Sequence, residues 1–315
     1  MSDASTRTID LVAPRGYCAG VDRAIETVER ALQELGAPVY VRGEIVHNRH
    51  VVETLAQKGA IFVATEHDVP TGATIILSAH GVSPEVHANC RARNLNVIDA
   101  TCPLVSKVHA EVRRYAGRGA TVLLVGHNDH DEVIGTSGEA PEYVIVVEDV
   151  AQAHAVVVAD PENVALTTQT TLSIDDTAEI VRVLRERFPA IAMAPNGDIC
   201  YATQNRQDAV KQAVAAGADL LLVVGSENSS NSNRMVEVGR AAGTDAYLIE
   251  NASSIDTQWF TGKTRIALTA GASAPEVLVR EVAELLQGHG YGRTGSDAPS
   301  AEGVVFALPR ELRTS

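Results

Sequence analysis

The sequence lacks the features that mark several large protein classes. No uninterrupted apolar run reaches the roughly 20 residues that a membrane-spanning helix requires. No block of Lys and Arg offsets the formal net charge of −14, so we expect neither nucleic acid nor an anionic membrane as the main partner. Residues 1–8 are short and polar and do not resemble a signal peptide, so a cytoplasmic protein is expected.

Cysteine is scarce, with Cys18, Cys90, Cys102 and Cys200 scattered along the chain. The absence of a CxxC pair excludes a zinc finger or thioredoxin motif of the usual spacing. The absence of a Gly-rich nucleotide fingerprint argues against direct use of a nicotinamide cofactor. In a reducing compartment, isolated cysteines favour metal binding or catalysis over disulfides.

The chain has 315 residues, which is more than one ordinary hydrophobic core accommodates, so two or three subdomains are expected. Apolar runs of strand length alternate with helix-period segments that end at glycine, which indicates an α/β fold with parallel sheets. The continuous apolar run 220–224 is typical of a strand that is covered on both faces.

Three cysteines occupy equivalent places in this pattern. Cys18, Cys102 and Cys200 each lie between a predicted strand and a predicted helix, where parallel sheets bind ligands. Cys90 lies inside a predicted helix and is interpreted as structural. Three converging thiolates predict an iron–sulfur cluster with one open iron, and a three-cysteine zinc site is the alternative.

Short polar loops follow other predicted strands, at His47, at His80, at Ser229 to Asn231 and at Ser273. Next to helix starts, such groups bind phosphate or simply cap the helix. Because four such loops share one end of the sheets, we favour a diphosphate site. The helix after the third loop is expected over 234–242, so that loop is expected to be free of helix.

Two further segments carry groups for proton transfer or substrate contact. In the loop 126–132, Glu132 follows His130 by two residues and becomes a proton donor near neutral pH if its pKa is raised by burial. A solvated acidic loop is the alternative. In 167–173, hydroxyls such as that of Thr170 either bind substrate or cap the next helix.

The end of the chain predicts little order. Residues 288–300 are rich in Gly and Ser, and we expect them to be mobile. Residues 304–308 are apolar enough to pack again on the body of the protein.

Several stretches resemble the family of 4-hydroxy-3-methylbut-2-enyl diphosphate reductases, also called the LytB family. The stretches are APRGYCAGV (13–21), EIVHN (44–48), ATCP (100–103), TQTTLS (168–173), GSENSSNSNR (225–234) and TAGAS (269–273). The resemblance runs in order over about 11–286, and its motifs are long.

The resemblance implies a trefoil of three α/β subdomains around a central [4Fe–4S] cluster. The expected division is an N-terminal strand at 1–17 that joins the third subdomain, subdomains at 18–101, 102–199 and 200–287, and a tail at 288–315. By motif position, Cys18, Cys102 and Cys200 would be the cluster ligands.

The resemblance also implies roles for substrate-binding and catalytic residues. The diphosphate would be held by His47, His80, Ser229, Ser230, Asn231 and Ser273. His130 and Thr170 would face the reacting end, with Thr171 as a lower-ranked neighbour, and Glu132 would supply protons. Asp131 stands where proline is common in the family, which puts the rigidity of that loop in doubt.

The implied reaction is a reductive dehydroxylation that yields isopentenyl and dimethylallyl diphosphate, the last step of the methylerythritol phosphate route. A ferredoxin or flavodoxin would supply electrons, and the protein would be a monomer or homodimer. The alternatives are a non-redox open-iron hydro-lyase or synthase of the quinolinate synthase type and a zinc-stabilised module that binds a phosphate ligand.

Overall fold

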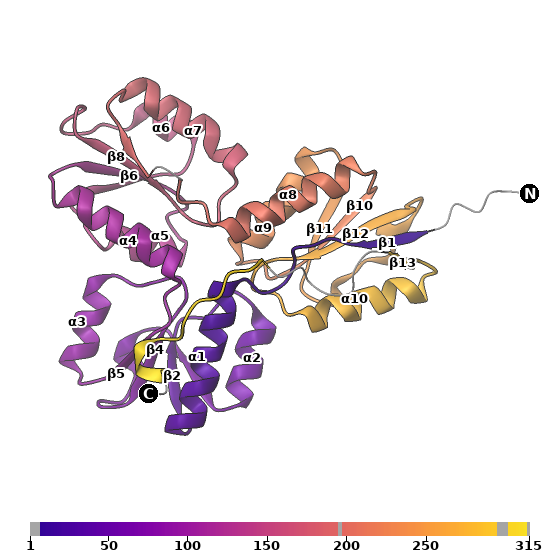
Figure 1. Cartoon of the computed structure of the whole chain (residues 1–315), viewed down its shortest axis with the longest axis horizontal. Helices are drawn as coiled ribbons and strands as arrows, with labels where there is room; N and C mark the ends of the chain where they lie inside the picture. Colours follow the sequence, from indigo (N-terminus) through magenta and orange to yellow (C-terminus); the bar gives the residue numbers. More distant parts are fainter. Residues whose placement is uncertain (1–6, 195–196, 295–301, 314–315) are drawn as a thin grey trace, which may run out of the picture. The chain divides into compact units, whose positions relative to one another are not determined.

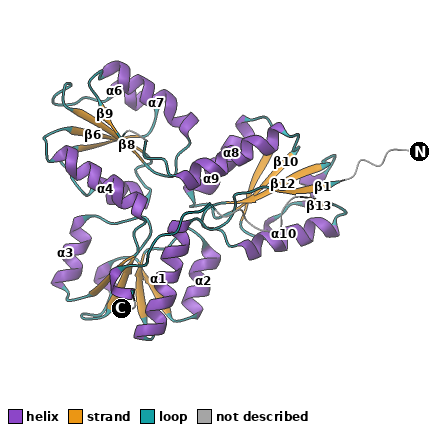
Figure 2. Cartoon of the chain, viewed as in Figure 1, coloured by secondary structure: helices purple, strands orange, loops and turns teal. Residues whose placement is uncertain are grey.

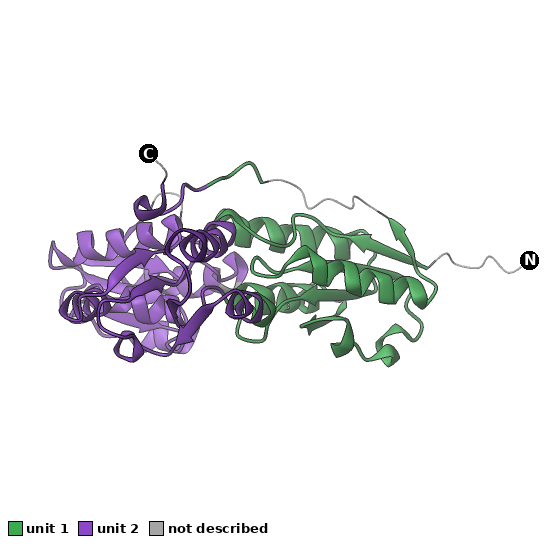
Figure 3. Ribbon diagram, turned by 90° about the horizontal axis from the view of Figure 1, so that it is seen from below, with its two compact units in different colours: residues 1–19, 47–51, 201–305 green, residues 20–46, 52–200, 306–315 purple. Residues whose placement is uncertain are grey.

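The computed structural model describes residues 7–194, 197–294 and 302–313, and strands alternate with helices along the chain (Figure 1). Two compact units form, which Figure 3 colours separately. Unit 1 contains residues 1–19, 47–51 and 201–305, and unit 2 contains residues 20–46, 52–200 and 306–315. All strand pairings among the described residues are parallel, so the predicted α/β class is confirmed.

Unit 1 is built on a sheet with the strand order β11-β10-β12-β1-β13. Its strands are β1 (Thr8–Leu11), β10 (Leu220–Val224), β11 (Asp245–Ile249), β12 (Arg265–Ala270) and β13 (Gly292–Thr294). Its helices are α8 (Tyr201–Ala215), α9 (Ser230–Ala241) and α10 (Glu276–Gly288), with 3-10 turns at Ala252–Ser254 and Thr257–Phe260.

Strand β10 shows why its sequence is apolar throughout. Leu222 packs in one core with Val282 of α10, whereas Leu221 and Val223 pack in another core with Met235 of α9. Figure 2 shows α9 and α10 on opposite sides of the sheet. Because successive side chains of a strand point to opposite faces, burial of both faces requires an apolar residue at each position.

Unit 2 contains two sheets, with the orders β3-β2-β4-β5 and β7-β6-β8-β9. The strands of the first are β2 (Val39–Arg42), β3 (Ala60–Val63), β4 (Thr74–Leu77) and β5 (Asn96–Asp99). Along the same stretch of chain lie α1 (Ala19–Leu35), α2 (Arg49–Gln57), α3 (Pro84–Ala92) and a 3-10 turn at Glu66–Asp68.

The second sheet of unit 2 is formed by β6 (Thr121–Val125), β7 (Val144–Val147), β8 (Val164–Thr168) and β9 (Ala192–Met193). Its helices are α4 (Pro103–Ala116), α5 (Asp131–Ser137), α6 (Val150–Ala155) and α7 (Ile174–Arg187). A 3-10 turn at Arg310–Leu312 follows near the end of the chain.

All three sheets share one strand order. The two sheets of unit 2 have the order 2-1-3-4 when their strands are numbered along the chain. The unit 1 sheet has the same order if β10, β11 and β12 are counted as strands 1 to 3 and β1 as strand 4, and β13 is added at the edge beside β1. Strand order therefore reverses between β10 and β12, between β2 and β4, and between β6 and β8. In open parallel sheets, ligands bind at the carboxyl ends of the two strands where the order reverses.

The structure differs from the sequence-based prediction in several elements. Helix α9 begins at Ser230 rather than at 234, because Ser229 caps it and brings the following residues into the first turn. The short strand β9 and helix α5 were not predicted.

The prediction for the chain end is wrong for its first part, because Gly288 ends α10 and Gly292–Thr294 pair with β1. Residues 295–301 of the predicted tail lie outside the described residues. Further along, Arg23 Nε donates a hydrogen bond to Ala307 O at 2.8 Å, in the segment expected to pack on the body. Across 7–194, 197–294 and 302–313, no helix is both long enough and apolar enough to span a bilayer.

Cys90 has a packing role. Its side chain is fully buried in a core with Ile75, Leu77 and Val86. Burial raises the pKa of its thiol, so it is held in the neutral form. The interpretation of Cys90 as structural agrees with this environment.

We predict that Cys90→Ser lowers the free energy of unfolding by about 1–3 kcal/mol, because it buries a hydroxyl in an apolar site. Cys90→Ala, which buries no polar group, is the matched control. Urea unfolding measures both. A serine variant as stable as the alanine variant would contradict this account.

Candidate functional site

The polar residues singled out in the sequence occupy three recurrent loop positions. The first position follows the strand on one side of each reversal of strand order. It holds Ser229 to Asn231 after β10, His47 after β2, and His130 with Glu132 after β6. The second follows the strand on the other side, β12, β4 or β8, and holds Ser273, His80 or Thr170. Each sheet therefore presents polar groups where parallel sheets bind ligands.

The third position holds the cysteines, which follow the strand next to the second position. Cys18 follows β1, Cys102 follows β5, and Cys200 follows β9. Each directly precedes the first residue of a helix, α1, α4 or α8. The equivalence predicted from the sequence extends to the surrounding strands.

One backbone hydrogen bond recurs at all three cysteines. The N–H of Cys18 donates to Ala272 O at 3.2 Å, that of Cys102 to Ala79 O at 2.9 Å, and that of Cys200 to Thr170 O at 3.0 Å. Each acceptor lies two residues beyond the end of β12, β4 or β8. The main chain of each cysteine is therefore anchored to the polar loop of the neighbouring strand.

In unit 1, the polar loops bond to one another. Asn231 Oδ1 accepts from Ala272 N at 3.0 Å, and Ser273 Oγ donates to His47 O at 2.9 Å. Asn228 Nδ2 lies 3.3 Å from His47 Nδ1. These contacts bring Asn231, Ser273 and the His47 backbone into one cluster at the carboxyl edge of the sheet.

Ser229 and two glycines explain how close this cluster is. The Ser229 side chain accepts from Ser232 N and so caps α9, which is the capping role considered as the alternative for this loop. A Cβ at Gly225 or Gly271 would overlap Ser232 Oγ. Only glycine at these two positions lets the strand ends approach the first turn of α9.

In unit 2, Glu132 and Thr170 form a buried pair. Thr170 donates its backbone N–H to Glu132 Oε1 at 2.7 Å and its hydroxyl to Glu132 Oε2 at 2.9 Å. Glu132 is 2% exposed, so the alternative of a solvated acidic loop is wrong for this residue. The neighbouring hydroxyl of Ser173, by contrast, accepts from Asp175 N and takes the capping role at α7.

Burial raises the pKa of Glu132 to about 7. The hydrogen bonds from Thr170 and the positive potential of His109 favour the ionised carboxylate but only partly offset the loss of solvation. A carboxyl with this pKa is present in both protonation states near neutral pH, as a general acid requires. The sequence-based condition for proton donation by Glu132 is therefore met.

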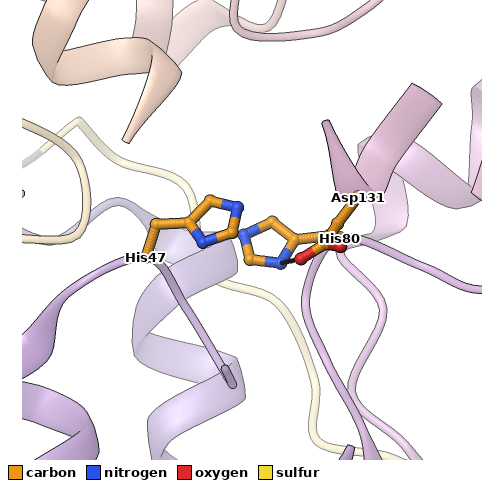
Figure 4. A group of neighbouring side chains, drawn as sticks. All are labelled: His47, His80 and Asp131. Atoms are coloured by element: carbon orange, nitrogen blue, oxygen red, sulfur yellow. Dashed lines mark ion pairs between the residues drawn. The ribbon is translucent and has the colours of Figure 1, made fainter. Parts of the chain in front are cut away.

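Two histidines of unit 2 lie close to the start of α5. His130 Nδ1 accepts from Glu132 N at 3.1 Å, so a neutral His130 ring carries its proton on Nε2. The rings of His80 and His130 have centroids 6.0 Å apart in an edge-to-face arrangement. Figure 4 shows the ion pair of His80 with Asp131, in which His80 Nδ1 lies 3.9 Å from Asp131 Oδ2.

Asp131 is the first residue of α5, which accounts for the missing proline. Proline is favoured at the first position of a helix, and an acidic residue there interacts favourably with the helix dipole. His130 caps the helix through its side chain. The loop thus keeps a defined geometry without proline.

Sequence reasoning missed Asp198, although its segment was noted. Its Oδ2 accepts from Thr167 Oγ1 at 2.8 Å and from Thr168 N at 3.3 Å, which ties the segment before Cys200 to β8. A signal was available in the sequence. Asp198 lies two residues before Cys200, and Asp99 lies three residues before the equivalent Cys102. Asp99 likewise binds Thr101, through backbone N at 2.9 Å.

Cys18, Cys102 and Cys200 are each suited to ligate a thiophilic metal. Cys18, Cys102 and Cys200 are partly exposed, and none of the four cysteines, all within the described residues, forms a disulfide. Thiolates hold iron–sulfur clusters and zinc, and each of these cysteines has the same backbone anchor. Buried Cys90 does not share this environment.

Comparison with known proteins gives consistent results. Residues 9–287 match the family described as LytB protein. The 4-hydroxy-3-methylbut-2-enyl diphosphate reductase of Mycobacterium sp. (strain KMS) is 56% identical over 310 residues, covering 98% of this chain and 93% of the relative.

Two solved structures are similar. The E-1-hydroxy-2-methyl-but-2-enyl-4-diphosphate reductase from Plasmodium falciparum has a TM-score of 0.93 at 40% identity, covering 98% of this chain and 97% of that chain. A (E)-4-hydroxy-3-methyl-but-2-enyl diphosphate reductase, described as the terminal enzyme of the non-mevalonate pathway, has a TM-score of 0.63 at 32% identity, covering 89% and 100%.

We predict that Glu132→Gln changes the pH dependence of stability. In the wild type, the folded state keeps a proton on Glu132 between pH 4.5 and about 7 that the unfolded state has lost, so stability falls as pH rises through this window. Above pH 7 the free energy of unfolding stays about 3 kcal/mol lower than it would be with an ordinary glutamate pKa.

The glutamine of the variant does not ionise, so its free energy of unfolding does not fall in this way. Its free energy of unfolding, relative to the wild type in the same metal state, should therefore rise from pH 5 to pH 7 and then level off. Urea unfolding across this range measures the difference. A difference that does not vary with pH would show that Glu132 ionises normally.

Proposed function

The chain belongs to the LytB protein family, and from this premise we propose that it reduces 4-hydroxy-3-methylbut-2-enyl diphosphate to isopentenyl and dimethylallyl diphosphate. This reaction ends the non-mevalonate, or methylerythritol phosphate, route to isoprenoids. The three relatives described above are all named as diphosphate reductases. No observation favours a hydro-lyase or a zinc-stabilised binding module.

One observation carries the proposal. At the carboxyl edge of each of the three sheets, the backbone N–H of a cysteine donates a hydrogen bond to the polar loop of the neighbouring strand. Cys18, Cys102 and Cys200 would hold a [4Fe–4S] cluster with one open iron. When bound, such a cluster supplies single electrons and a Lewis-acidic iron.

We assign diphosphate binding to His47, His80, Ser229, Ser230, Asn231 and Ser273. Their donors are hydroxyl, amide and imidazole groups, and Ser230 and Asn231 stand in the first turn of α9, where backbone N–H groups favour an anion. These groups bind a diphosphate without a cluster of lysines, which is consistent with the net charge of −14.

Glu132 supplies the proton in this assignment, since its pKa of about 7 allows it to hold and release one. Thr170 orients both carboxylate oxygens, and its backbone carbonyl anchors Cys200. Movement of the Thr170 loop would therefore affect the proton donor and a thiol together. His130 and Thr170 would face the reacting end of the substrate.

By analogy with the family, electrons would come from a ferredoxin or flavodoxin. We place the enzyme in the cytoplasm as a monomer or homodimer. Turnover with each reduced donor, and sedimentation of the purified protein, would test these assignments.

We predict that Cys18→Ser loses the cluster. Protein purified without oxygen should hold about four iron and four sulfide per chain in the wild type, and much less in the variant. Cys90→Ser is the matched control and should keep the wild-type content. Zinc without sulfide in the wild type would refute the proposed function.

We also predict that Glu132→Gln retains iron, sulfide and substrate binding but loses about 10²- to 10⁴-fold in kcat, because the amide cannot donate a proton in this way. Anaerobic turnover with reduced methyl viologen measures the rate. Glu179→Gln, on the surface of α7, is the control. Unchanged turnover in Glu132→Gln would require another proton donor.

A further inference from the structure

The loop that carries Cys18 is held by several polar contacts in unit 1. Arg15 Nη2 donates to Glu276 Oε1 at 2.8 Å and Arg15 Nε to Oε2 at 3.1 Å. The N–H of Gly16 donates to Ala270 O at 3.4 Å, and that of Cys18 to Ala272 O. Gly16 has φ +73°, which only glycine adopts easily, so the loop has one preferred path.

Arg206 of α8 completes this set of contacts from another direction. Its guanidinium is 1% exposed, and Nη2 donates to Gly16 O at 2.7 Å. Nη1 donates to Ala202 O at 2.8 Å, within the first turn of α8. Arg206 therefore ties the helix that follows Cys200 to the residue two positions before Cys18.

Glu302 supplies the opposite charge to Arg206. Its Oε2 accepts from Arg206 Nη1 at 3.0 Å and its Oε1 from Asn205 Nδ2 at 2.9 Å. The Glu302 side chain is 10% exposed, so this is a largely buried ion pair. Removing one partner leaves the other charge buried without compensation, and the remaining side chain then tends to move toward solvent.

We propose that Arg206 is a positioning residue for Cys18, and that Glu302, near the end of the chain, keeps Arg206 in place. The C-terminal segment thereby helps to hold a thiol that lies almost 300 residues earlier in the sequence. The consequence for metal retention rests on the proposed function, in which Cys18 is a cluster ligand. The geometric part, in which Arg206 and Glu302 position Cys18, does not depend on the proposed function.

The geometric part is tested by thiol alkylation of metal-free, full-length protein. Trypsin places Cys18, Cys102 and Cys200 in different peptides, so mass spectrometry gives a separate rate for each thiol with N-ethylmaleimide. Glu302→Gln keeps the size of the side chain and removes its charge. Cys18 should react roughly tenfold faster in this variant, as expected for loss of a charge-assisted hydrogen bond, while Cys102 and Cys200 react as in the wild type.

Three further variants make the test specific. Arg206→Lys keeps the charge, but an ammonium lacks the planar fork that reaches Gly16 O and Glu302 together, so it should also expose Cys18. Glu302→Asp keeps the carboxylate and should react more slowly at Cys18 than Glu302→Gln. Glu281→Gln on the exposed side of α10 makes the same charge change elsewhere in unit 1 and should leave all three rates unchanged.

Unchanged Cys18 reactivity in both Glu302→Gln and Arg206→Lys would overturn the proposal. Equal acceleration at all three thiols would also overturn it, because general loosening does not single out Cys18. Release of iron to a chelator from anaerobically purified Glu302→Gln should be several-fold faster than from the wild type. If the wild type held no iron and sulfide, the proposed function would fail, whereas the alkylation rates would still decide the role of Arg206.

Discussion

The backbone hydrogen bond from each cysteine N–H to the neighbouring polar loop is the contact on which the candidate site depends. It lies beyond the strand ends and joins the segment after β1 to that after β12, the segment after β5 to that after β4, and the segment after β9 to that after β8. Backbone donors in such places need a partner, so the bond is strongly favoured. Each thiol therefore takes its position from the main chain of a sheet, which is more rigid than a side chain.

The electrostatics follow from what is buried beside these loops. Glu132 is surrounded by protein and accepts two hydrogen bonds from one threonine, which is too little to keep it ionised throughout the neutral range. Arg15 and Arg206 are equally buried, but each meets a carboxylate, Glu276 or Glu302. The protein thus compensates the charges that hold the Cys18 loop, whereas the Glu132 carboxyl meets no opposite charge as strong.

Much of the local structure follows from the sequence. Continuous apolar runs such as 220–224, proline at positions 84 and 103, and glycine after helices determine strands and helix ends through local sterics and burial. The same local signals place Cys18, Cys102 and Cys200 before helices and Cys90 inside one. They failed where capping was misjudged: Ser229 starts α9 one turn earlier than its composition suggests, because its hydroxyl satisfies a helix N–H.

Most helices and strands, the α/β class and the residue types of the site follow from the sequence alone. Two features depend on how the elements pack. One is the strand order, which places each cysteine beside a particular polar loop, and the other is the burial that raises the pKa of Glu132 to about 7. The tertiary structure also brings Glu302 to Arg206, and Arg206 to Gly16. These are contacts between residues far apart along the chain, and no local pattern encodes them, because they depend on how separately formed strands and helices pack.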